Sequence, residues 1–456
     1  MSTNPVVPAL DNDQQAIQDL HAQLAGLNIV PADQGVAGEL KVSDLRRGKR
    51  RLEDDSVGLA TLVDVDGVWF WQQGMATRGV RGRRAGTGLT TLFGGTPLTT
   101  VKFEKLGKNK IAETLYKMDM TFTPYPGLRE YKNGALGAVG AKPVERGRIL
   151  LFVHGTFSNN DNLFKQLEDL KESPEGPQFL NDITKQANGM GVNYDQVLTF
   201  DHYTVSRSPL LNALDLARFM SNSTADIDII CHSRGGLVTR WFMEVFDRVN
   251  RPRRRAVMVG SPLRGTSLAA PDRVRNGIHL FANMGKMVGQ GLSLIPFAQV
   301  AGSLMQIVFS LGDVVAKTPV LDAAVAMIPG LAAMSRVENN FELHSLKDCA
   351  NPTPEYSAVT SIFEPEEIGW KFWRVFCGFG QRVAGAADNL IFRDADGTPC
   401  KNDLVVDTSS MTEYGFPPVI PPTRIMAFDE TKRVYHTVYF REKDTIKFIR
   451  STLGIQ

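Results

Sequence analysis

The chain has 456 residues, and its 51 lysines and arginines nearly balance its 49 aspartates and glutamates, which leaves a formal net charge of +2. This length allows a large core and either one elaborated domain or two, and the near-neutral charge gives no global electrostatic footprint for nucleic-acid binding. The four cysteines include no Cys-x-x-Cys pair, so the sequence predicts neither a zinc site nor a disulfide framework.

The first residues carry no recognisable export signal. Met1–Gln15 is polar and has neither the basic n-region nor the apolar h-region of a secretory signal peptide. A cytoplasmic location is therefore the default expectation. Secretion that does not depend on a cleavable signal peptide stays open, because such export has no recognisable sequence pattern.

The first 145 residues divide into an arm and a small module. Residues 1–40 are expected to form an arm or linker with one helix at Asp13–Leu24. In residues 41–145, short apolar runs separated by glycines predict a β-rich accessory module in which no chemical motif lies. Its expected strands are Gly58–Val65, Val68–Gln72, Gly88–Phe93, Val101–Leu106 and Met118–Thr123.

Residues 146–456 alternate strand-like and helical runs, a pattern that predicts a doubly wound, mostly parallel α/β sheet. The expected strands are Ile149–Val153, Gln196–Phe200, Ile227–Ile230, Ala256–Gly260, Tyr356–Phe363 and Val434–Phe440. The expected helices are Asn162–Lys171, Leu210–Met220, Leu237–Val249 and Asp444–Leu453. Ligands of such sheets bind at the carboxyl ends of the strands, where His154, Ser233 and Ser261 emerge.

A strongly apolar insertion interrupts this alternation over residues 271–345. No charged residue lies between Lys286 and Asp313, and this run is long enough to cross a bilayer. Because it contains Pro296, several glycines and three glutamines, a helical cap over the active edge of the sheet is the preferred interpretation, and a transmembrane helix is the alternative. A second insertion is expected over residues 364–400.

A nucleophile elbow is predicted where the apolar run Ile227–Ile230 ends. The sequence Cys-His-Ser-Arg-Gly-Gly follows from residue 231. In the G-x-S-x-G elbow, a sharp turn between strand and helix requires small residues two positions before and two positions after the serine. Cys231 and Gly235 occupy these positions, with Cys231 in place of the usual glycine. Ser233 is therefore the candidate nucleophile.

A serine nucleophile needs a histidine to accept its proton and a carboxylate to orient that histidine. In folds that carry their nucleophile on an elbow of this kind, these groups follow one another in the chain as serine, acid and histidine. Only His279, His344 and His436 follow Ser233 in the chain, and the first two belong to the apolar insertion. His436 is therefore the candidate base.

The candidate acid lies in the segment Lys401–Met411, between the nucleophile and the base. Asp403 is preferred, because a carboxylate that opens a turn just before an apolar pair can point back into the site. Asp407 is the alternative acid.

Two backbone N–H groups are candidates for stabilising the negative charge that develops on a substrate carbonyl. One belongs to Arg234, directly after the nucleophile. The other belongs to Thr156, in the loop after the first strand of the α/β region. The histidines next to these elements, His154, His202 and His232, are interpreted as structural.

Four segments of this region share one resemblance: Leu151–Thr156, His232–Gly236, Val259–Thr266 and Asn402–Val406. Together they resemble the α/β-hydrolase superfamily, and within it the bacterial lipase and esterase branch. The last segment is similar to the Asn-Asp-Gly-Leu-Val run that holds the catalytic aspartate of such lipases, with Leu404 in place of the glycine. The resemblance covers about residues 146–456. It implies ester hydrolysis through a serine triad, with no cofactor and no metal.

The expected function is therefore that of a serine esterase or lipase that forms an acyl-enzyme. The apolar insertion favours a lipid or phospholipid ester, which would place the protein in lipid metabolism, and it offers a possible contact with a membrane surface. Thioesterase, amidase and acyltransferase activities stay open on the same fold. The alternative outside the enzymes is a non-catalytic binding or scaffold protein, in which residues 41–145 would be the functional region. No nucleic-acid partner is expected.

Overall fold

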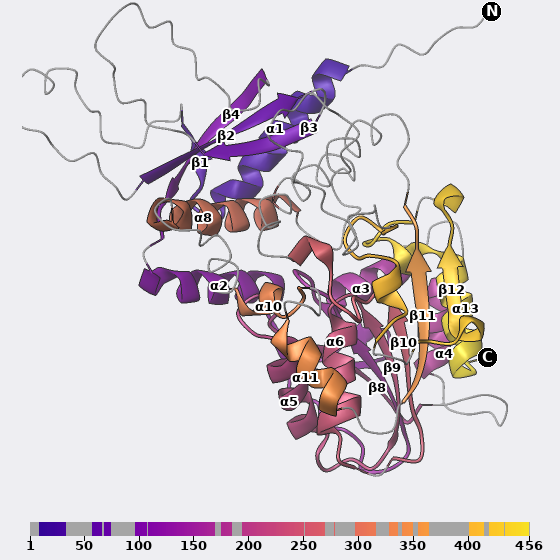
Figure 1. The fold of residues 1–456 in the computed structure, drawn as a ribbon. Helices are drawn as coiled ribbons and strands as arrows, with labels where there is room; N and C mark the ends of the chain where they lie inside the picture. The colour runs from indigo at the N-terminus through magenta and orange to yellow at the C-terminus, as the bar shows by residue number, and fades with distance from the viewer. Residues whose placement is uncertain are drawn as a thin grey trace, which may run out of the picture.

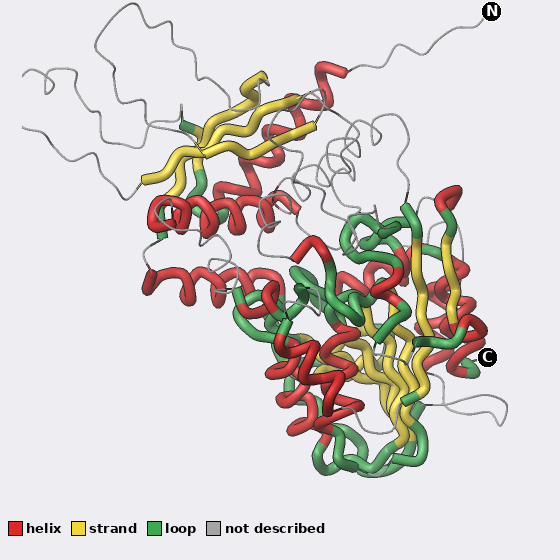
Figure 2. Tube along the Cα trace, viewed as in Figure 1, coloured by secondary structure: helices red, strands yellow, loops and turns green. Residues whose placement is uncertain are grey.

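The computed structural model describes most of two sheets and the helices around them (Figures 1 and 2). The described residues are 9–32, 57–65, 68–73, 96–106, 108–168, 175–184, 194–249, 251–269, 278, 297–315, 328–335, 340–349, 354–363, 401–414, 419–432 and 434–455. The expected strand Gly88–Phe93 and the expected insertion 364–400 lie outside this part of the chain.

The larger sheet has eight strands in the order β12-β11-β10-β9-β7-β8-β5-β6. Strands β7 to β12 pair in parallel, and β5 runs antiparallel to β8. The sequence-based expectation of a mixed α/β fold with a mostly parallel sheet is confirmed. The strands are β5 (Gly127–Lys132), β6 (Ala135–Leu136), β7 (Arg148–Val153), β8 (Gln196–Asp201), β9 (Asp226–His232), β10 (Arg254–Val259), β11 (Glu355–Ser361) and β12 (Ile425–Phe428).

Helices cover both faces of this sheet, and the central strands are apolar on both sides for that reason. In β7, Leu150 and Phe152 join one hydrophobic cluster while Leu151 and Val153 join the other, because successive side chains of a strand point to opposite faces. The first cluster includes side chains of α3 (Asn160–Glu168), α4 (Glu175–Thr184) and α13 (Lys443–Leu453). The second includes α5 (Pro209–Met220), α6 (Gly235–Arg240), the π-helix Trp241–Phe246 and α11 (Phe341–Cys349).

The smaller sheet contains four antiparallel strands in the order β1-β4-β2-β3. With the helix α1 (Ala9–Ala25) it forms what we call the N-terminal sheet, seen apart from the larger sheet in Figure 2. Its strands are β1 (Val30–Pro31), β2 (Val57–Val65), β3 (Val68–Gln73) and β4 (Thr96–Glu104). The sequence placed the α/β region from residue 146 onward, but the larger sheet already takes β5 and β6 from residues before that point.

Two expected strands are wrong. Of the expected strand Met118–Thr123, all but Thr123 belongs to the helix α2 (Lys108–Phe122), because the buried residues Ile111, Leu115, Met118 and Phe122 recur at helical intervals. Val434–Phe440 is a loop that leads into a short 3-10 turn at Tyr439–Arg441, and the last strand is β12 instead. Apart from Tyr435, which is half-buried, the β-branched and aromatic side chains of that loop are buried around the site described below rather than paired in the sheet.

The described helices of the apolar insertion are α8 (Phe297–Val315), α10 (Pro329–Ala332) and α11. In Figure 1, α8 lies between the N-terminal sheet and α2. Within the described ranges, no helix combines the length and the hydropathy that a bilayer crossing requires.

Candidate active site

A nucleophile elbow joins β9 to α6. Ser233 has φ +53°, a left-handed conformation that is uncommon for a residue with a side chain and that marks stored backbone strain. A Cβ at Gly235 would lie 2.4 Å from the carbonyl oxygen of Val153, and one at Gly236 would lie 2.5 Å from Ser261. Glycine at both positions therefore lets the elbow pack closely against the end of β7 and against Ser261, and Ser233 stands at the top of the turn. Cys231 is fully buried below it.

Ser233, His436 and Asp403 form a continuous hydrogen-bonded series. The His436 Nε2 lies 2.8 Å from the Ser233 Oγ, and the His436 Nδ1 lies 2.8 Å from the Asp403 Oδ2. A carboxylate accepts only, so Nδ1 carries the hydrogen and Nε2 is free to accept from the serine. All three side chains are buried. The structure thus brings the candidate nucleophile, base and preferred acid into one arrangement.

Four donors hold the Asp403 carboxylate. Its Oδ1 accepts from the backbone N–H groups of Val405, at 3.1 Å, and Val406, at 2.8 Å. Its Oδ2 accepts from the Tyr439 hydroxyl at 2.9 Å as well as from His436. Burial and the adjacent Asp403 charge keep the pKa of Tyr439 well above its usual value, so this hydroxyl stays a donor. Sequence reasoning missed Tyr439, because it stood in a run read as a strand.

The backbone next to Asp403 has an unusual conformation. Leu404 has φ +80°, in the left-handed region that favours glycine. Its N–H donates to the Asn402 Oδ1 at 2.9 Å, which holds the turn, and its side chain is buried in the hydrophobic core. In the Asn-Asp-Gly-Leu-Val run of the lipases, a glycine stands at the position of Leu404. This protein has the left-handed turn at that position although the residue is not glycine.

The alternative acid has other partners. The Asp407 carboxylate accepts from the backbone N–H of Ser267 at 3.0 Å and from the Ser267 hydroxyl. It therefore ties the segment after Asp403 to the loop that follows β10, while the Nδ1 of His436 is bonded to Asp403.

The two candidate oxyanion donors flank the nucleophile. A Cβ at Gly155 would lie 2.7 Å from the Ser233 Cβ, so glycine lets this loop approach the serine. The next N–H along, that of Phe157, donates to Thr204 at 3.2 Å. The N–H groups of Thr156 and Arg234, in contrast, have no acceptor among the described residues. Both are available to a substrate oxygen.

The three neighbouring histidines make hydrogen bonds that fix loops. The His232 ring bonds the His436 carbonyl at 2.8 Å, and the His154 Nε2 accepts from the His202 N–H at 3.0 Å. Burial lowers the pKa of His154 and of His232 to about 3, and it lowers that of His202 well below its usual value. All three rings are therefore neutral at physiological pH.

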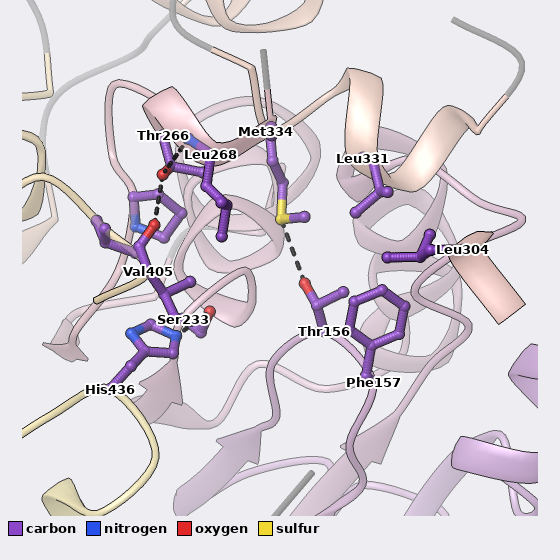
Figure 3. Close-up of a pocket in the computed structure, with 13 residues that line it drawn as sticks. Thr156, Phe157, Ser233, Thr266, Leu268, Leu304, Leu331, Met334, Val405 and His436 are labelled. Atoms are coloured by element: carbon purple, nitrogen blue, oxygen red, sulfur yellow. Dashed lines mark hydrogen bonds between the residues drawn. The ribbon is translucent and has the colours of Figure 1, made fainter. Parts of the chain in front are cut away.

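An apolar cavity opens onto the serine (Figure 3). It has about 650 Å³ of empty volume, its open mouth included, and Ser233, His436, Thr156 and Thr266 are its polar lining residues. The remaining walls are formed by Phe157, Pro262, Leu268, Ala269, Leu304, Leu331, Met334, Val405 and Val406. The described residues contain no group of three or more histidine, cysteine or acidic side chains that could hold a metal ion.

The strand order, the elbow and the chain order of serine, acid and histidine define the α/β-hydrolase class. The sequence model of a family described as a domain of unknown function (DUF7379) matches residues 121–454, and the chain belongs to that family. The match begins before β5, so it includes the two strands that precede residue 146. No curated protein matches the chain.

Solved structures similar to this chain include lipases and esterases at low identity. Phospholipase PlaB from Legionella pneumophila is 12% identical, with a TM-score of 0.30, and the match covers 58% of this chain but only 45% of PlaB. Lipase 1 from Pelosinus fermentans is 11% identical, with a TM-score of 0.39 and coverages of 67% and 97%. A putative aryl esterase from Burkholderia cenocepacia is 16% identical, with a TM-score of 0.30 and coverages of 68% and 93%.

Proposed function

We propose that this protein is a serine hydrolase that cleaves carboxylic esters through an acyl-enzyme. The observation that carries the proposal is the hydrogen-bonded series Ser233–His436–Asp403 at the floor of an apolar cavity. A serine hydroxyl is a weak nucleophile until an oriented base can take its proton. Here the base lies 2.8 Å from the hydroxyl, and its second nitrogen is oriented by a carboxylate.

In the first half of the reaction the Ser233 Oγ attacks the ester carbonyl while His436 Nε2 takes its proton. Asp403 stabilises the resulting imidazolium and keeps the ring aligned. The N–H groups of Thr156 and Arg234 stabilise the oxyanion, a role in which one donor is typically worth about 3 kcal/mol. The leaving alcohol then takes the proton from His436. In the second half, water is deprotonated by His436, attacks the acyl-enzyme and restores the free Ser233 hydroxyl.

The cavity walls favour an acyl group as the substrate portion next to the serine. Leu304 of α8 and Leu331 of α10 belong to the apolar insertion 271–345 and line the cavity with Leu268 and Met334. An apolar wall gains from burying methylene groups and offers little to a charged substrate. The proposed substrate is therefore a lipid or phospholipid ester, with the insertion as a cap over the site. A membrane surface would supply such an ester.

Covalent labelling of the full-length protein with a fluorophosphonate tests the proposal. The wild-type protein should be labelled, and Ser233→Ala should not. Ser221→Ala is the matched control, because Ser221 is exposed at the end of α5 and should leave labelling unchanged. A folded wild-type protein that neither reacts nor hydrolyses p-nitrophenyl esters would contradict the proposal and favour a scaffold on a hydrolase fold.

A further inference from the structure

The helix α8 is buried between two parts of the molecule. Every residue from Val300 to Ser310 is buried. A helix that packs on a single core keeps one polar face in solvent, so burial on all sides means that α8 is covered from more than one direction. In Figure 1 the N-terminal sheet lies on one side of α8, and α2 lies on the other. The two faces of α8 therefore pack against different parts of the molecule.

One face of α8 contacts the N-terminal sheet and α1. A Cβ at Gly302 would lie only 2.2 Å from the Leu24 Cδ2 on α1, so the two helices meet closely at this glycine. The Gln306 side chain donates to the Glu104 carbonyl at the end of β4 at 3.0 Å. The ring of Phe309 lies 6.4 Å from that of Phe103 on the same strand. Positions 302, 306 and 309 recur at helical spacing, so they define a single face.

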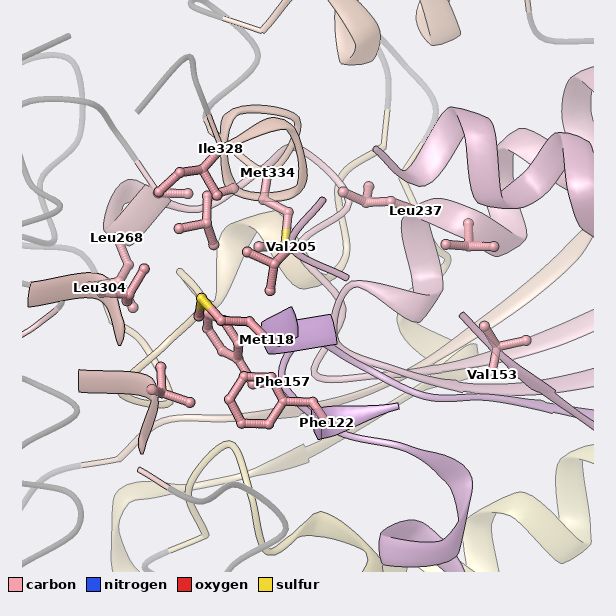
Figure 4. Close-up of a cluster of buried hydrophobic side chains, with 14 of the residues drawn as sticks. Met118, Phe122, Val153, Phe157, Val205, Leu237, Leu268, Leu304, Ile328 and Met334 are labelled. Carbon is pink, nitrogen blue, oxygen red and sulfur yellow. The ribbon is translucent and has the colours of Figure 1, made fainter. Parts of the chain in front are cut away.

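The opposite face of α8 reaches the catalytic cavity. Position 304 lies about 200° around the helix from positions 302 and 306, since each residue turns by about 100°. Leu304 is buried and lines the same cavity as Ser233 and His436. Figure 3 places Leu304 and Leu331 on the side of the cavity away from His436, and Figure 4 shows Leu304 near Leu268 in the buried cluster.

We infer that the N-terminal sheet is part of the substrate-binding apparatus: it holds α8 so that Leu304 closes the far wall of the cavity, and Leu304 limits the length of the acyl group. This inference rests on the proposed function. It gives α1 and the strands β1 to β4 a role through packing, although they carry no catalytic motif. Leu304 is then a specificity-determining residue, while Gly302 and Gln306 are positioning residues that act through it.

The first test measures kcat/KM on p-nitrophenyl esters of rising chain length. Each further methylene that the cavity buries should raise kcat/KM by about fourfold until the chain meets Leu304. Leu304→Ala should move this limit to a longer chain, and Leu304→Trp should move it to a shorter one. The acetyl ester places a single methyl group next to Ser233, so its kcat/KM should change by less than about twofold in both Leu304 variants.

Ile307→Ala is the matched control, since Ile307 is a buried residue of α8 that does not line the cavity. It should lower thermal stability and leave the chain-length limit in place. The assignment of Leu304 would be overturned if its two variants showed the limit of the wild-type protein and of Ile307→Ala.

The second test asks whether the N-terminal sheet positions Leu304. Gly302→Ala introduces a methyl group against Leu24 and should displace α8, which changes the chain-length limit. Leu24→Ala in the same protein removes the obstructing side chain and should restore the wild-type limit. Leu24→Ala by itself destabilises the core, because it removes a buried side chain. If Gly302→Ala acted only by lowering stability, adding Leu24→Ala would make the defect worse rather than restore the limit. Gln306→Ala loses the hydrogen bond to the Glu104 carbonyl at the end of β4. It should change the chain-length limit in the same direction as Gly302→Ala does.

Fluorophosphonate labelling separates the inference from the function on which it depends. All α8 variants should keep labelling by a fluorophosphonate with short alkyl groups within about twofold of the wild-type rate, because Ser233, His436 and Asp403 are unchanged. Intact labelling with an unchanged chain-length limit in Gly302→Ala and Gln306→Ala would overturn the role of the N-terminal sheet alone. Should Gly302→Ala fail to fold, the Gln306→Ala result decides. Absence of labelling in the wild-type protein would overturn both proposals.

Discussion

The α/β sheet and the N-terminal sheet differ in how their sequences relate to their roles. In the α/β sheet, short local patterns such as the elbow at Ser233 specify both backbone shape and chemistry. In the N-terminal sheet, the described residues carry no comparable pattern, and their contribution is a packing surface for α8. A motif search therefore finds the first kind of region and passes over the second, which contacts α8 but contributes no residue to the cavity lining.

The largest expected effect separates the two aspartates of the Lys401–Met411 segment. Asp403→Asn leaves the site nearly isosteric but lets His436 adopt the wrong tautomer, so kcat should fall by roughly 10⁴-fold with little change in Tm. Asp407→Asn weakens the tie to Ser267 and should lower Tm while kcat falls by less than about tenfold. Steady-state kinetics and thermal unfolding of both variants check this. Equal losses of kcat would contradict the assignment of Asp403.

A second difference concerns acid stability, because the α/β sheet buries neutral histidines. His154 and His232 have pKa values lowered by burial to about 3, so between about pH 6.5 and pH 3 the unfolded chain binds protons that the folded protein does not. Their contribution to stability is thus complete above about pH 6.5 and is lost as the pH falls. Asp201, whose pKa burial raises to about 7, has the opposite dependence and offsets part of it.

Urea unfolding at pH 7.5, 6 and 5 should therefore show a free energy of unfolding that falls mainly between pH 6 and pH 5, with a slope of up to about one proton, because Asp201 offsets one of the two histidines. His232→Gln should reduce that slope by up to one proton. A slope that is unchanged by this variant would show that His232 is not a neutral buried group.

The strained turn at Leu404 offers a smaller effect in which two terms compete. Leu404→Gly relieves left-handed strain of about 1 kcal/mol but removes a buried side chain worth about 2 to 3 kcal/mol. We expect burial to dominate, with a net destabilisation of about 1 to 2 kcal/mol and little change in kcat. Denaturant unfolding measures this difference, and a more stable variant would mean that strain, not packing, decides at this position.

The smallest expected effect is that of Tyr439, which donates one of four hydrogen bonds to Asp403. A hydrogen bond to a charged group typically contributes about 1.5 to 3 kcal/mol. Tyr439→Phe should nevertheless reduce kcat by only about fivefold, because three other donors still hold the carboxylate. Phe448→Leu on α13 is a packing control at a partly buried position outside the cavity lining, and it should leave kcat unchanged. Unaltered kcat in Tyr439→Phe would show that the two backbone donors and His436 suffice to hold the carboxylate.

Patterns that are local in sequence predicted much of the α/β fold. The strands around β7, β8, β9, β10 and β11 follow from apolar runs with clear ends, and Ser233 follows from the elbow at one of those ends. The expectation for Val434–Phe440 was wrong because its β-branched composition fits a strand, whereas its side chains are buried in a loop that presents His436. The apolar residues Ile111, Leu115, Met118 and Phe122 recur at helical spacing, but the six residues Met118–Thr123 alone are too few to show that period, so α2 was not predicted.

Contacts between distant segments explain what sequence reasoning could not reach. Tyr439 touches Asp403 only because two loops from different strands meet, and no local spacing records that meeting. The same holds for Leu304, whose place in the cavity depends on α1 and β4 about 200 or more positions earlier in the chain. Pairing of this kind belongs to the tertiary fold, so it has no periodic signal in the sequence.

Trapping the acyl-enzyme tests the central claim most directly. A p-nitrophenyl ester mixed with the full-length protein and quenched in acid within the first turnovers should add one acyl group per molecule, and peptide mass mapping should locate it on Ser233. The account predicts this adduct in the wild-type protein and its absence in Ser233→Ala. Ester turnover by Ser233→Ala at the wild-type rate, or an adduct on another residue, would contradict it.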